Sequence, residues 1–385
     1  MKNSKKKLIL LVFGTRPEAI KMAPLITTLR KYDNFFDLKI CVTGQHREML
    51  DQVLNVFDII PDFDLEIMKQ NQNLTELTST LILKISNLLN DVKPDILLVH
   101  GDTTTAMTAS IAGYYNSVDL GHIEAGLRTN NIYSPYPEEL NRQIISRIAK
   151  WHFAPTETAF NNLIKEGVNK SSIFITGNTV VDSLLLTIDK IEQSKQKKED
   201  LIKCLSHSIN TFDWEKVRFV LITGHRRENF GHGFIEICSA IKKLAIKFPE
   251  LHFIYPVHLN PKVQDPVNEL LGELKNVHLI SPLGYEAFIY LMSRCYFVLT
   301  DSGGIQEEAP TLGKPVLVMR EVTERPEAVA AGTVLLVGAD SNKIFNSVST
   351  LIEDEGLYLK MAHAHNPYGD GNAALRIVEN IMKNN

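Results

Sequence analysis

The chain has 385 residues, 44% of them hydrophobic and 22% charged, and its formal net charge is −4 at pH 7. This length predicts two domains, and the composition is typical of a soluble globular protein. The slightly acidic balance gives no reason to expect a nucleic-acid partner, and no apolar run approaches the roughly 20 residues of a membrane helix. The four cysteines (Cys41, Cys204, Cys238 and Cys295) show no metal-ligand spacing and indicate reduced thiols in the cytoplasm, with Cys41 and Cys295 buried.

The first half of the chain alternates short apolar runs with helical segments, which is the pattern of a parallel α/β sheet. The expected strands are Leu8–Phe13, Leu38–Val42, Ile96–His100, Leu120–Ile123, His152–Ala154 and Ile173–Thr176. A helix is expected from Pro17 to about Tyr32, and a long amphipathic helix over Leu74–Val92.

A polar region at about 189–200 separates the two halves, and the same pattern then starts again. The expected strands of the second half are Phe219–Thr223, His252–Pro256, Val277–Ile280, Tyr296–Thr300, Pro315–Val318 and Thr333–Val337. We therefore predict two doubly wound, Rossmann-like parallel-sheet domains. The first comprises residues 1–181 and is completed by a C-terminal helix at 372–385, and the second comprises residues 182–371.

Charged side chains follow the carboxyl ends of the expected strands, where doubly wound sheets bind ligands. The cationic set is Arg16, Lys21, His225, Arg226, Arg227 and Arg325, and the carboxylate set is Asp102, Glu124, Glu138 and Glu308. Cations suit the oxygens of a diphosphate, and positioned carboxylates can take and deliver protons. A cleft between the domains would bring both sets together, and Phe288 could hold a base there.

The segment Asp301–Pro310 follows a buried strand and leads into a short helix. Ser302, Gly303 and Gly304 then occupy a strand-to-helix turn, where backbone N–H groups without helical partners can meet an anion. Glu308, about one helical turn further on, could accept hydrogen bonds from sugar hydroxyls. An ordinary tight turn is the alternative interpretation.

Several of these residues also have a structural interpretation. Arg16 could form a surface ion pair with Glu18, Asp102 could cap the helix that follows it, and Glu138 suits the first turn of a helix. Glu124 is harder to explain in this way, because an unpaired buried carboxylate is costly. The histidines with a structural alternative are His46, His122, His225 and His258.

Seven segments carry a combined pattern: Phe13–Pro24, His100–Thr104, Glu124–Thr129, Gly224–Glu228, Asp301–Pro310, Thr323–Ala328 and Asn366–Gly371. Together they resemble the non-hydrolysing UDP-N-acetylglucosamine 2-epimerases, from about Leu8 to Met382. The resemblance implies a glycosyltransferase-B type fold with the active site in the cleft between the domains. It also implies a cytoplasmic enzyme, often a homodimer, that supplies precursors of cell-surface polysaccharide.

The activity implied by the resemblance is the interconversion of UDP-N-acetylglucosamine and UDP-N-acetylmannosamine. In that family the C2 proton is removed, UDP leaves C1, and UDP adds back to a 2-acetamidoglucal intermediate. A nicotinamide oxidising C3 would be another route, but Gly14–Glu18 is not a GxGxxG fingerprint. We therefore expect no cofactor and no metal.

Roles carry over by matching positions. The catalytic set is Asp102, Glu124, Glu138 and His225, and the substrate-binding set is Arg16, Lys21, Phe288, Ser302, Gly303, Gly304, Glu308 and Arg325. Within the second set, Glu308 resembles a ribose clamp and Phe288 a uracil contact. Leu283 stands where several relatives carry Gln near the base, so we expect a main-chain contact there.

Some members bind a second UDP-N-acetylglucosamine as an activator, and part of that site resembles Gln45, His46 and His258. Asn71 stands where some members carry Arg, which argues against activation in this chain. Three other functions share the expected fold: a hydrolysing relative that releases UDP and N-acetylmannosamine, a sugar transferase, and a UDP-sugar sensor. The sequence shows neither the apolar acceptor groove nor the membrane-facing basic patch that would support a transferase.

Overall fold

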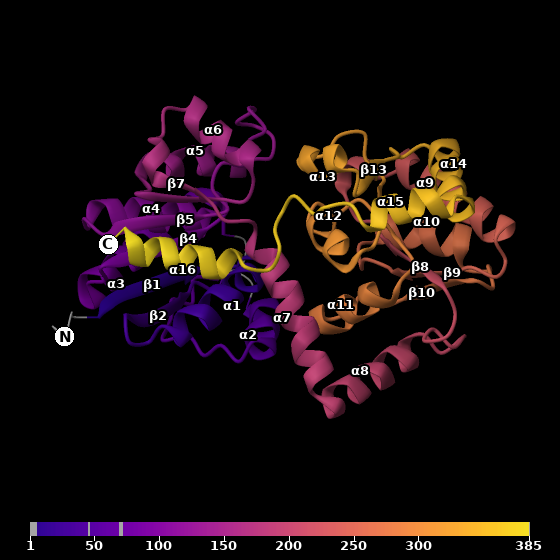
Figure 1. The fold of residues 1–385 in the computed structure, drawn as a ribbon, viewed down its shortest axis with the longest axis horizontal. Helices are drawn as coiled ribbons and strands as arrows, with labels where there is room; N and C mark the ends of the chain where they lie inside the picture. Colours follow the sequence, from indigo (N-terminus) through magenta and orange to yellow (C-terminus); the bar gives the residue numbers. More distant parts are fainter. Residues whose placement is uncertain (1–5, 45–46, 69–71, 385) are drawn as a thin grey trace. The chain divides into compact units, whose positions relative to one another are not determined.

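The computed structural model describes residues 6–44, 47–68 and 72–384 (Figure 1). The chain divides into two compact units, Met1–Ser183 with Tyr368–Asn385 (unit 1) and Leu184–Pro367 (unit 2). Within the described residues, unit 1 contains a seven-stranded sheet of order β3-β2-β1-β4-β5-β6-β7, and unit 2 a six-stranded sheet of order β10-β9-β8-β11-β12-β13. The paired strands run parallel, as between β1 and β4 or β8 and β11. The predicted fold class of two doubly wound parallel-sheet domains is confirmed.

The elements of unit 1 lie close to their predicted positions. The strands are β1 Lys7–Phe13, β2 Phe36–Val42, β3 Phe63–Asp64, β4 Ile96–His100, β5 Asp119–Ile123, β6 Trp151–Ala154 and β7 Ile173–Ile175. The helices are α1 Arg16–Lys31, α2 Arg47–Val56, α3 Leu74–Val92, α4 Thr104–Tyr115, α5 Glu138–Ile148, α6 Glu157–Lys165 and α16 Ala373–Lys383, with a 3-10 turn η1 at Lys170–Ser172. The helix α7, Thr179–Gln193, begins in unit 1 and ends in unit 2.

The elements of unit 2 repeat the alternation. Its strands are β8 Phe219–Thr223, β9 His252–Pro256, β10 Val277–Ile280, β11 Val298–Thr300, β12 Val316–Val318 and β13 Val334–Leu336. Its helices are α8 Lys195–Ser208, α9 His232–Lys247, α10 Pro261–Leu271, α11 Tyr285–Arg294, α12 Ile305–Glu308, α13 Pro326–Ala331, α14 Ser341–Glu353 and α15 Glu355–Ala362. Two 3-10 turns, η2 Arg227–Asn229 and η3 Ala309–Leu312, follow β8 and α12.

The polar region at 189–200 is helical, where the sequence indicated only a separation between the halves. Ser194 breaks the helix between α7 and α8, and its side chain accepts a hydrogen bond from the Lys197 N–H at 3.3 Å. Side chains one turn apart then support α8, as Gln196 does by donating to the Asp200 carboxylate at 3.0 Å. A segment that is polar nearly all round can be helical when such pairs compensate for the lack of an apolar face.

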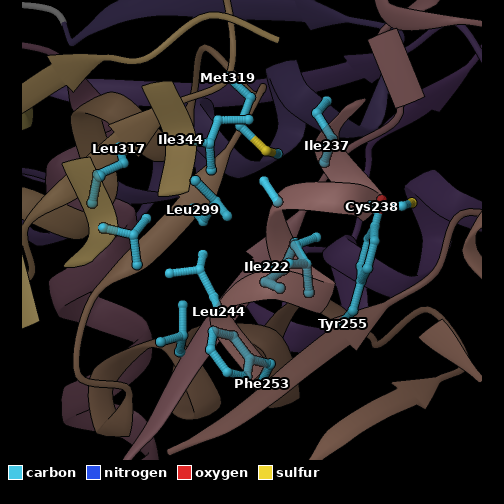
Figure 2. Packing of buried hydrophobic residues seen from close by; sticks show 14 of the residues in the cluster. Ile222, Ile237, Cys238, Leu244, Phe253, Tyr255, Leu299, Leu317, Met319 and Ile344 are labelled. Atoms are coloured by element: carbon cyan, nitrogen blue, oxygen red, sulfur yellow. The ribbon is translucent and has the colours of Figure 1, made fainter. Parts of the chain in front are cut away.

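Apolar side chains from neighbouring strands fill the core of unit 2. Figure 2 shows Ile222 of β8, Phe253 of β9 and Leu299 of β11 in one cluster with Leu244 of α9, and all four are fully buried. Burying a side chain of this size contributes roughly 1.5–3 kcal/mol. The strands therefore form a rigid base for the loops at their carboxyl ends.

In each sheet the strand order changes direction at one point. This point lies between β1 and β4 in unit 1 and between β8 and β11 in unit 2. Ligands of open parallel sheets bind there, outside the carboxyl ends of the strands. The loops at these points are Gly14–Arg16 after β1, Gly101–Thr103 after β4, Gly224–Arg226 after β8 and Asp301–Gly304 after β11.

Neutral histidines are buried in the sheet of unit 1, which gives its stability a pH dependence. His122 on β5 is fully buried, and its Nε2 lies 2.7 Å from the Gly101 carbonyl. Burial lowers the pKa of His122 to about 3. Its neighbour in register, His152 on β6, has a pKa lowered to about 4, again mainly by burial. Both side chains are therefore neutral in the folded state near pH 6.

We expect the stability contributed by neutral His122 to be lost as the pH falls below about 6.5. Below that value the unfolded chain binds a proton that the folded chain does not. The free energy of unfolding of the wild type should fall relative to that of His122→Gln by up to about 1.4 kcal/mol per pH unit. Urea unfolding between pH 7.5 and 5 measures this difference. The exposed His363, changed to Gln, is the control, and a gap for His122→Gln that does not change with pH would contradict the expectation.

Candidate active site

The loops after β1, β4 and β5 surround a cavity of about 170 Å³ in unit 1. Its lining residues are Thr15, Pro17, Glu18, Lys21, His100, Gly101, Asp102, Thr103 and Glu124. Three predicted site residues, Lys21, Asp102 and Glu124, therefore lie around one space. Arg16 stands at the start of α1, half-buried, and forms no side-chain hydrogen bond or ion pair with the described residues.

Glu18 organises the first of these loops, a role that the sequence interpretation missed. The Thr15 side chain caps α1 and the Glu18 side chain returns to the cap, so that Oε2 accepts from the N–H groups of Gly14 at 3.0 Å and Thr15 at 2.8 Å. Its other oxygen accepts from the Thr103 hydroxyl at 2.7 Å. Burial raises the pKa of Glu18, and these hydrogen bonds oppose the rise. The alternative ion pair between Arg16 and Glu18 is not formed.

Glu124 enters the cavity from the end of β5 with its backbone in the left-handed region, at a φ of 63°. A non-glycine residue there is uncommon and is often held for function. The side chain is 7% exposed. Its Oε2 forms an ion pair with Lys21 Nζ and accepts a hydrogen bond from Asn178 Nδ2 at 2.6 Å. A lysine and an amide thus compensate for the burial of this carboxylate.

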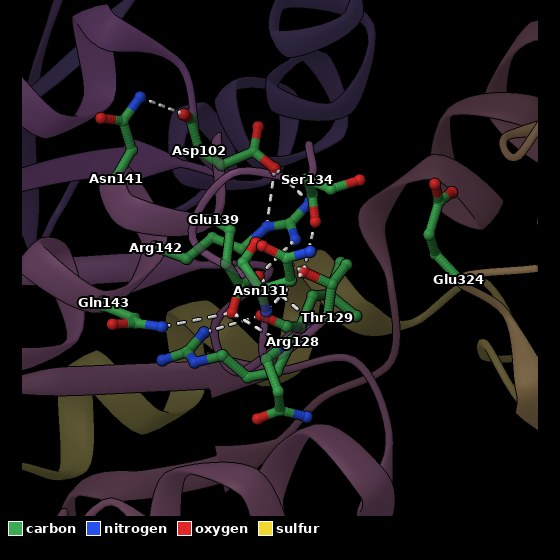
Figure 3. A network of polar contacts seen from close by, with 12 residues as sticks. Asp102, Arg128, Thr129, Asn131, Ser134, Glu139, Asn141, Arg142, Gln143 and Glu324 are labelled. Carbon is green, nitrogen blue, oxygen red and sulfur yellow. Dashed lines mark hydrogen bonds and ion pairs between the residues drawn. The ribbon is translucent and has the colours of Figure 1, made fainter. Parts of the chain in front are cut away.

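Asp102 does not cap the helix that follows it. Thr103 is the cap of α4, accepting from the Ala106 N–H at 3.0 Å. The Asp102 carboxylate pairs instead with Arg142 of α5, whose Nε donates to Oδ2 at 2.8 Å (Figure 3). Asn141 donates to the Asp102 carbonyl at 2.8 Å. Helix α5 therefore holds Asp102 through both its side chain and its backbone.

The two glutamates that begin α5 differ in their surroundings. Glu138 is half-buried at the first position of the helix. Glu139 is fully buried and accepts from the Thr129 N–H at 3.0 Å and from Arg142 at 3.0 Å (Figure 3). Glu139 thus fixes the segment between Glu124 and α5. Glu138 does not take part in fixing this segment, and its proposed role as an acid/base residue stays a prediction.

His100, the last residue of β4, lines the same cavity. It is 2% exposed, and its Nε2 has no hydrogen-bond partner among the described residues. Burial lowers the pKa of His100 to about 4, with Glu124 acting in the opposite direction. A neutral imidazole therefore lies beside the carboxylate. No separate signal in the sequence indicates this, because His100 has the pattern of an ordinary strand end.

In unit 2, the loops after β8 and β11 meet at a buried carboxylate. Asp301 is fully buried, and its Oδ2 accepts from the N–H groups of His225 at 2.9 Å and Arg226 at 2.8 Å. A Cβ added to Gly303 would come within 3.6 Å of the Arg226 guanidinium. The predicted site residues His225, Ser302 and Gly303 therefore lie at one edge of this sheet.

The remaining predicted contacts of unit 2 lie around α12 and α11. Glu308 ends α12, 9% exposed, and a Cβ added to Gly304 would come within 3.9 Å of its Oε2. Arg325 forms an ion pair with the buried Glu307, a partner that the sequence interpretation did not identify. Phe288 is half-buried in the first turn of α11, four residues after Gly284, whose carbonyl accepts its N–H at 2.9 Å.

Of the candidate activator site, only His258 falls in the described part of the chain. Its ring stacks on that of His225, with centroids 5.3 Å apart and planes at 12°. Gln45, His46 and Asn71 lie outside the described residues. No helix among residues 6–44, 47–68 and 72–384 has the length and apolar character needed to cross a membrane.

The chain is similar in sequence and structure to known enzymes. The family model of UDP-N-acetylglucosamine 2-epimerases matches residues 29–382. The chain is 55% identical over 377 residues to the UDP-N-acetylglucosamine 2-epimerase of Campylobacter jejuni and 54% identical over 377 residues to that of Escherichia coli K12, with 98% of each chain covered. It is also similar to the crystal structure of the Neisseria meningitidis UDP-GlcNAc 2-epimerase bound to UDP-GlcNAc. The TM-score is 0.89 at 51% identity, over 98% of this chain and 100% of the other.

Proposed function

Because this chain belongs to the UDP-N-acetylglucosamine 2-epimerase family, we propose that it interconverts UDP-N-acetylglucosamine and UDP-N-acetylmannosamine without net hydrolysis. The chain is an enzyme of that class, and what we propose here is the chemical route of the reaction. UDP is eliminated and then added back through an enzyme-held 2-acetamidoglucal. The product would supply precursors of cell-surface polysaccharide.

The observation that carries the proposal is the pair of carboxylates in the unit 1 cavity. Asp102 and Glu124 line the same space of about 170 Å³, and each is held by a cation, Arg142 and Lys21. Inversion at C2 requires proton transfer on both faces of the sugar carbon, and therefore more than one positioned group. Glu138, at the start of α5, is the third proposed acid/base residue.

The proposed reaction has two steps and involves no oxidation or reduction. A carboxylate takes the C2 proton, the C2–H electron pair forms the C1=C2 double bond, and the C1–O bond breaks with its electrons going to UDP. In the return step the electron pair of the C1=C2 double bond takes a proton on the other face of C2, and a UDP oxygen forms the new bond to C1. The C2–H is not next to a carbonyl, so stabilisation of the departing diphosphate must drive the elimination.

We assign the diphosphate contacts to two groups of residues. Arg16 in unit 1 has no protein partner for its guanidinium among the described residues, and guanidinium groups bind phosphate oxygens bidentately. In unit 2, the loop Ser302–Gly304 offers a hydroxyl and backbone N–H groups, and Arg226 lies beside Gly303. We assign the ribose to Glu308 and the uracil to Phe288 with its loop.

Incubation with UDP-N-acetylglucosamine in deuterated water tests the proposal. We expect ¹H NMR to show deuterium at C2 of both UDP-sugars, with no accumulation of free sugar, because the C2 proton exchanges while UDP stays on the enzyme. Equal amounts of free UDP and N-acetylmannosamine would instead establish the hydrolysing reaction. Binding of UDP without any exchange at C2 would indicate a sensor.

A further inference from the structure

Asp301 occupies the position where the strand order of unit 2 changes direction. It follows β11 directly, and its N–H donates to the Thr223 carbonyl of β8 at 3.2 Å. Its Oδ2 is fully engaged with the loop after β8, where it accepts from the backbone N–H groups of His225 and Arg226 and lies 3.4 Å from Asn229 Nδ2. One carboxylate oxygen is thus enough to hold the loop.

The other oxygen of Asp301 is not used by the loop. Oδ1 is buried and accepts no hydrogen bond from the residues that the structure describes. It lies 3.9 Å from Nδ1 of His225. A buried carboxylate oxygen without a donor is costly, so we expect Oδ1 to accept a hydrogen bond when substrate is bound. Hydrogen bonds between acid/base groups are often long without substrate and shorten in the complex.

His225 is the side chain that can supply this donor. Its imidazole is half-exposed, so that Nδ1 is near Asp301 while the rest of the ring reaches the surface of the loop. The titratable and charged groups that face it are Asp301 from the loop after β11, His258 from the loop after β9, and Arg226 from its own loop. Burial lowers the pKa of His225, His258 and Arg226 lower it further, and Asp301 alone of these three neighbours raises it.

We propose that Asp301 is a positioning residue for His225: Oδ1 accepts the Nδ1–H, orients the ring, and favours the imidazolium that donates from Nε2 to the departing diphosphate. This assignment rests on the proposed function of the site. No proton leaves His225 in this role, because the charge that develops on the diphosphate is stabilised by a hydrogen bond. The same carboxylate therefore shapes the loop through Oδ2 and tunes the imidazole through Oδ1.

The substitution Asp301→Asn separates these two roles. The Asn carbonyl can still accept from the backbone N–H groups of His225 and Arg226, but an amide NH₂ replaces the charged oxygen that faces Nδ1. We expect kcat at pH 7.5 to fall by about 10²-fold. The descending limb of the pH–rate profile should shift to lower pH, because the imidazolium loses its favourable neighbour.

Tyr255→Phe is the matched control, since the Tyr255 hydroxyl donates to the Gly224 carbonyl at 3.0 Å in the same loop. It removes a buried hydrogen bond without changing the charge beside His225. We expect it to lower the melting temperature and to leave the pH limb in place. An unshifted limb in Asp301→Asn, or an equal shift in Tyr255→Phe, would overturn the proposal.

NMR of ¹⁵N-histidine-labelled protein gives a readout that needs no turnover. At a pH where His225 is neutral, the wild type should carry the proton on Nδ1, and Asp301→Asn should carry it on Nε2. His225→Gln identifies the resonance. A wild-type Nε2–H tautomer would refute the role of Asp301 even if Asp301→Asn fails to fold. If the Nδ1–H tautomer is observed but no exchange occurs at C2, the proposed reaction is refuted, while the contact between Asp301 and His225 is supported.

Discussion

Glu124→Gln is expected to slow the interconversion of the two UDP-sugars by about 10²- to 10⁴-fold, the usual contribution of a general acid or base. UDP binding should stay close to that of the wild type. The deuterium content of C2 during single turnovers is the decisive measurement, because it reports proton transfer directly and separately from product release.

The local structure explains why the fold should survive the loss of the chemistry. Lys21 and Asn178 both donate to Oε2 of Glu124, and the carbonyl oxygen of a Gln at this position can accept from the same two groups. The substitution keeps the volume of the side chain and the left-handed backbone at residue 124. It removes the capacity to hold a proton and the negative charge that pairs with Lys21. We therefore expect a lower free energy of unfolding, and a folded protein that still binds UDP.

Glu166→Gln is the matched control for this change. Glu166 is also a carboxylate of unit 1 paired with a cation, since Arg128 Nε donates to it at 2.6 Å, but it does not line the cavity. The same neutralisation there should leave turnover unchanged. Wild-type rates of C2 exchange in Glu124→Gln would remove Glu124 from the acid/base roles.

The sequence is most informative where a strand ends. Short apolar runs predicted β4 at Ile96–His100, β8 at Phe219–Thr223 and β9 at His252–Pro256 with the bounds that the structure has. Buried parallel strands are nearly continuous apolar runs, and the polar residue that follows one marks its carboxyl end. This is why the sequence alone assigns Asp102 and Glu124 to the same edge of a sheet.

The partners of these side chains could not be predicted in the same way. Asp102 is held by Arg142, 40 residues away, and Glu124 by Asn178, 54 residues away. No local rule relates such positions, because the pairing depends on how α5 and the loop after β7 pack on the sheet. Local rules instead left a helix cap as an open alternative for Asp102, and Thr103 provides that cap. Sequence patterns therefore located the edge of the sheet, and tertiary packing determined which charges are compensated there.

Arg142→Gln is expected to lower both stability and activity. Its side chain is 11% exposed and joins Asp102 to the fully buried Glu139 (Figure 3). Removing one partner of a buried ion pair leaves an uncompensated charge, so we expect a loss of about 3 kcal/mol in the free energy of unfolding. The Asp102 carboxylate also loses its fixed orientation, and misplacement of an acid/base group by about 1 Å can cost about 10²-fold in rate.

Arg128→Gln distinguishes the two effects. Arg128 is also a buried arginine of unit 1, with its side chain 1% exposed and paired with Glu166, but it does not contact Asp102. We expect a comparable loss of stability in urea unfolding, while kcat per folded molecule stays near that of the wild type.

In Arg142→Gln, kcat per folded molecule should fall as it does in Asp102→Asn. The double variant should lose little more activity than either single variant, because both substitutions act through one carboxylate. Additive losses in the double variant would mean that Arg142 acts on the reaction by another route, through Glu139 and the segment that leads from Glu124 to α5.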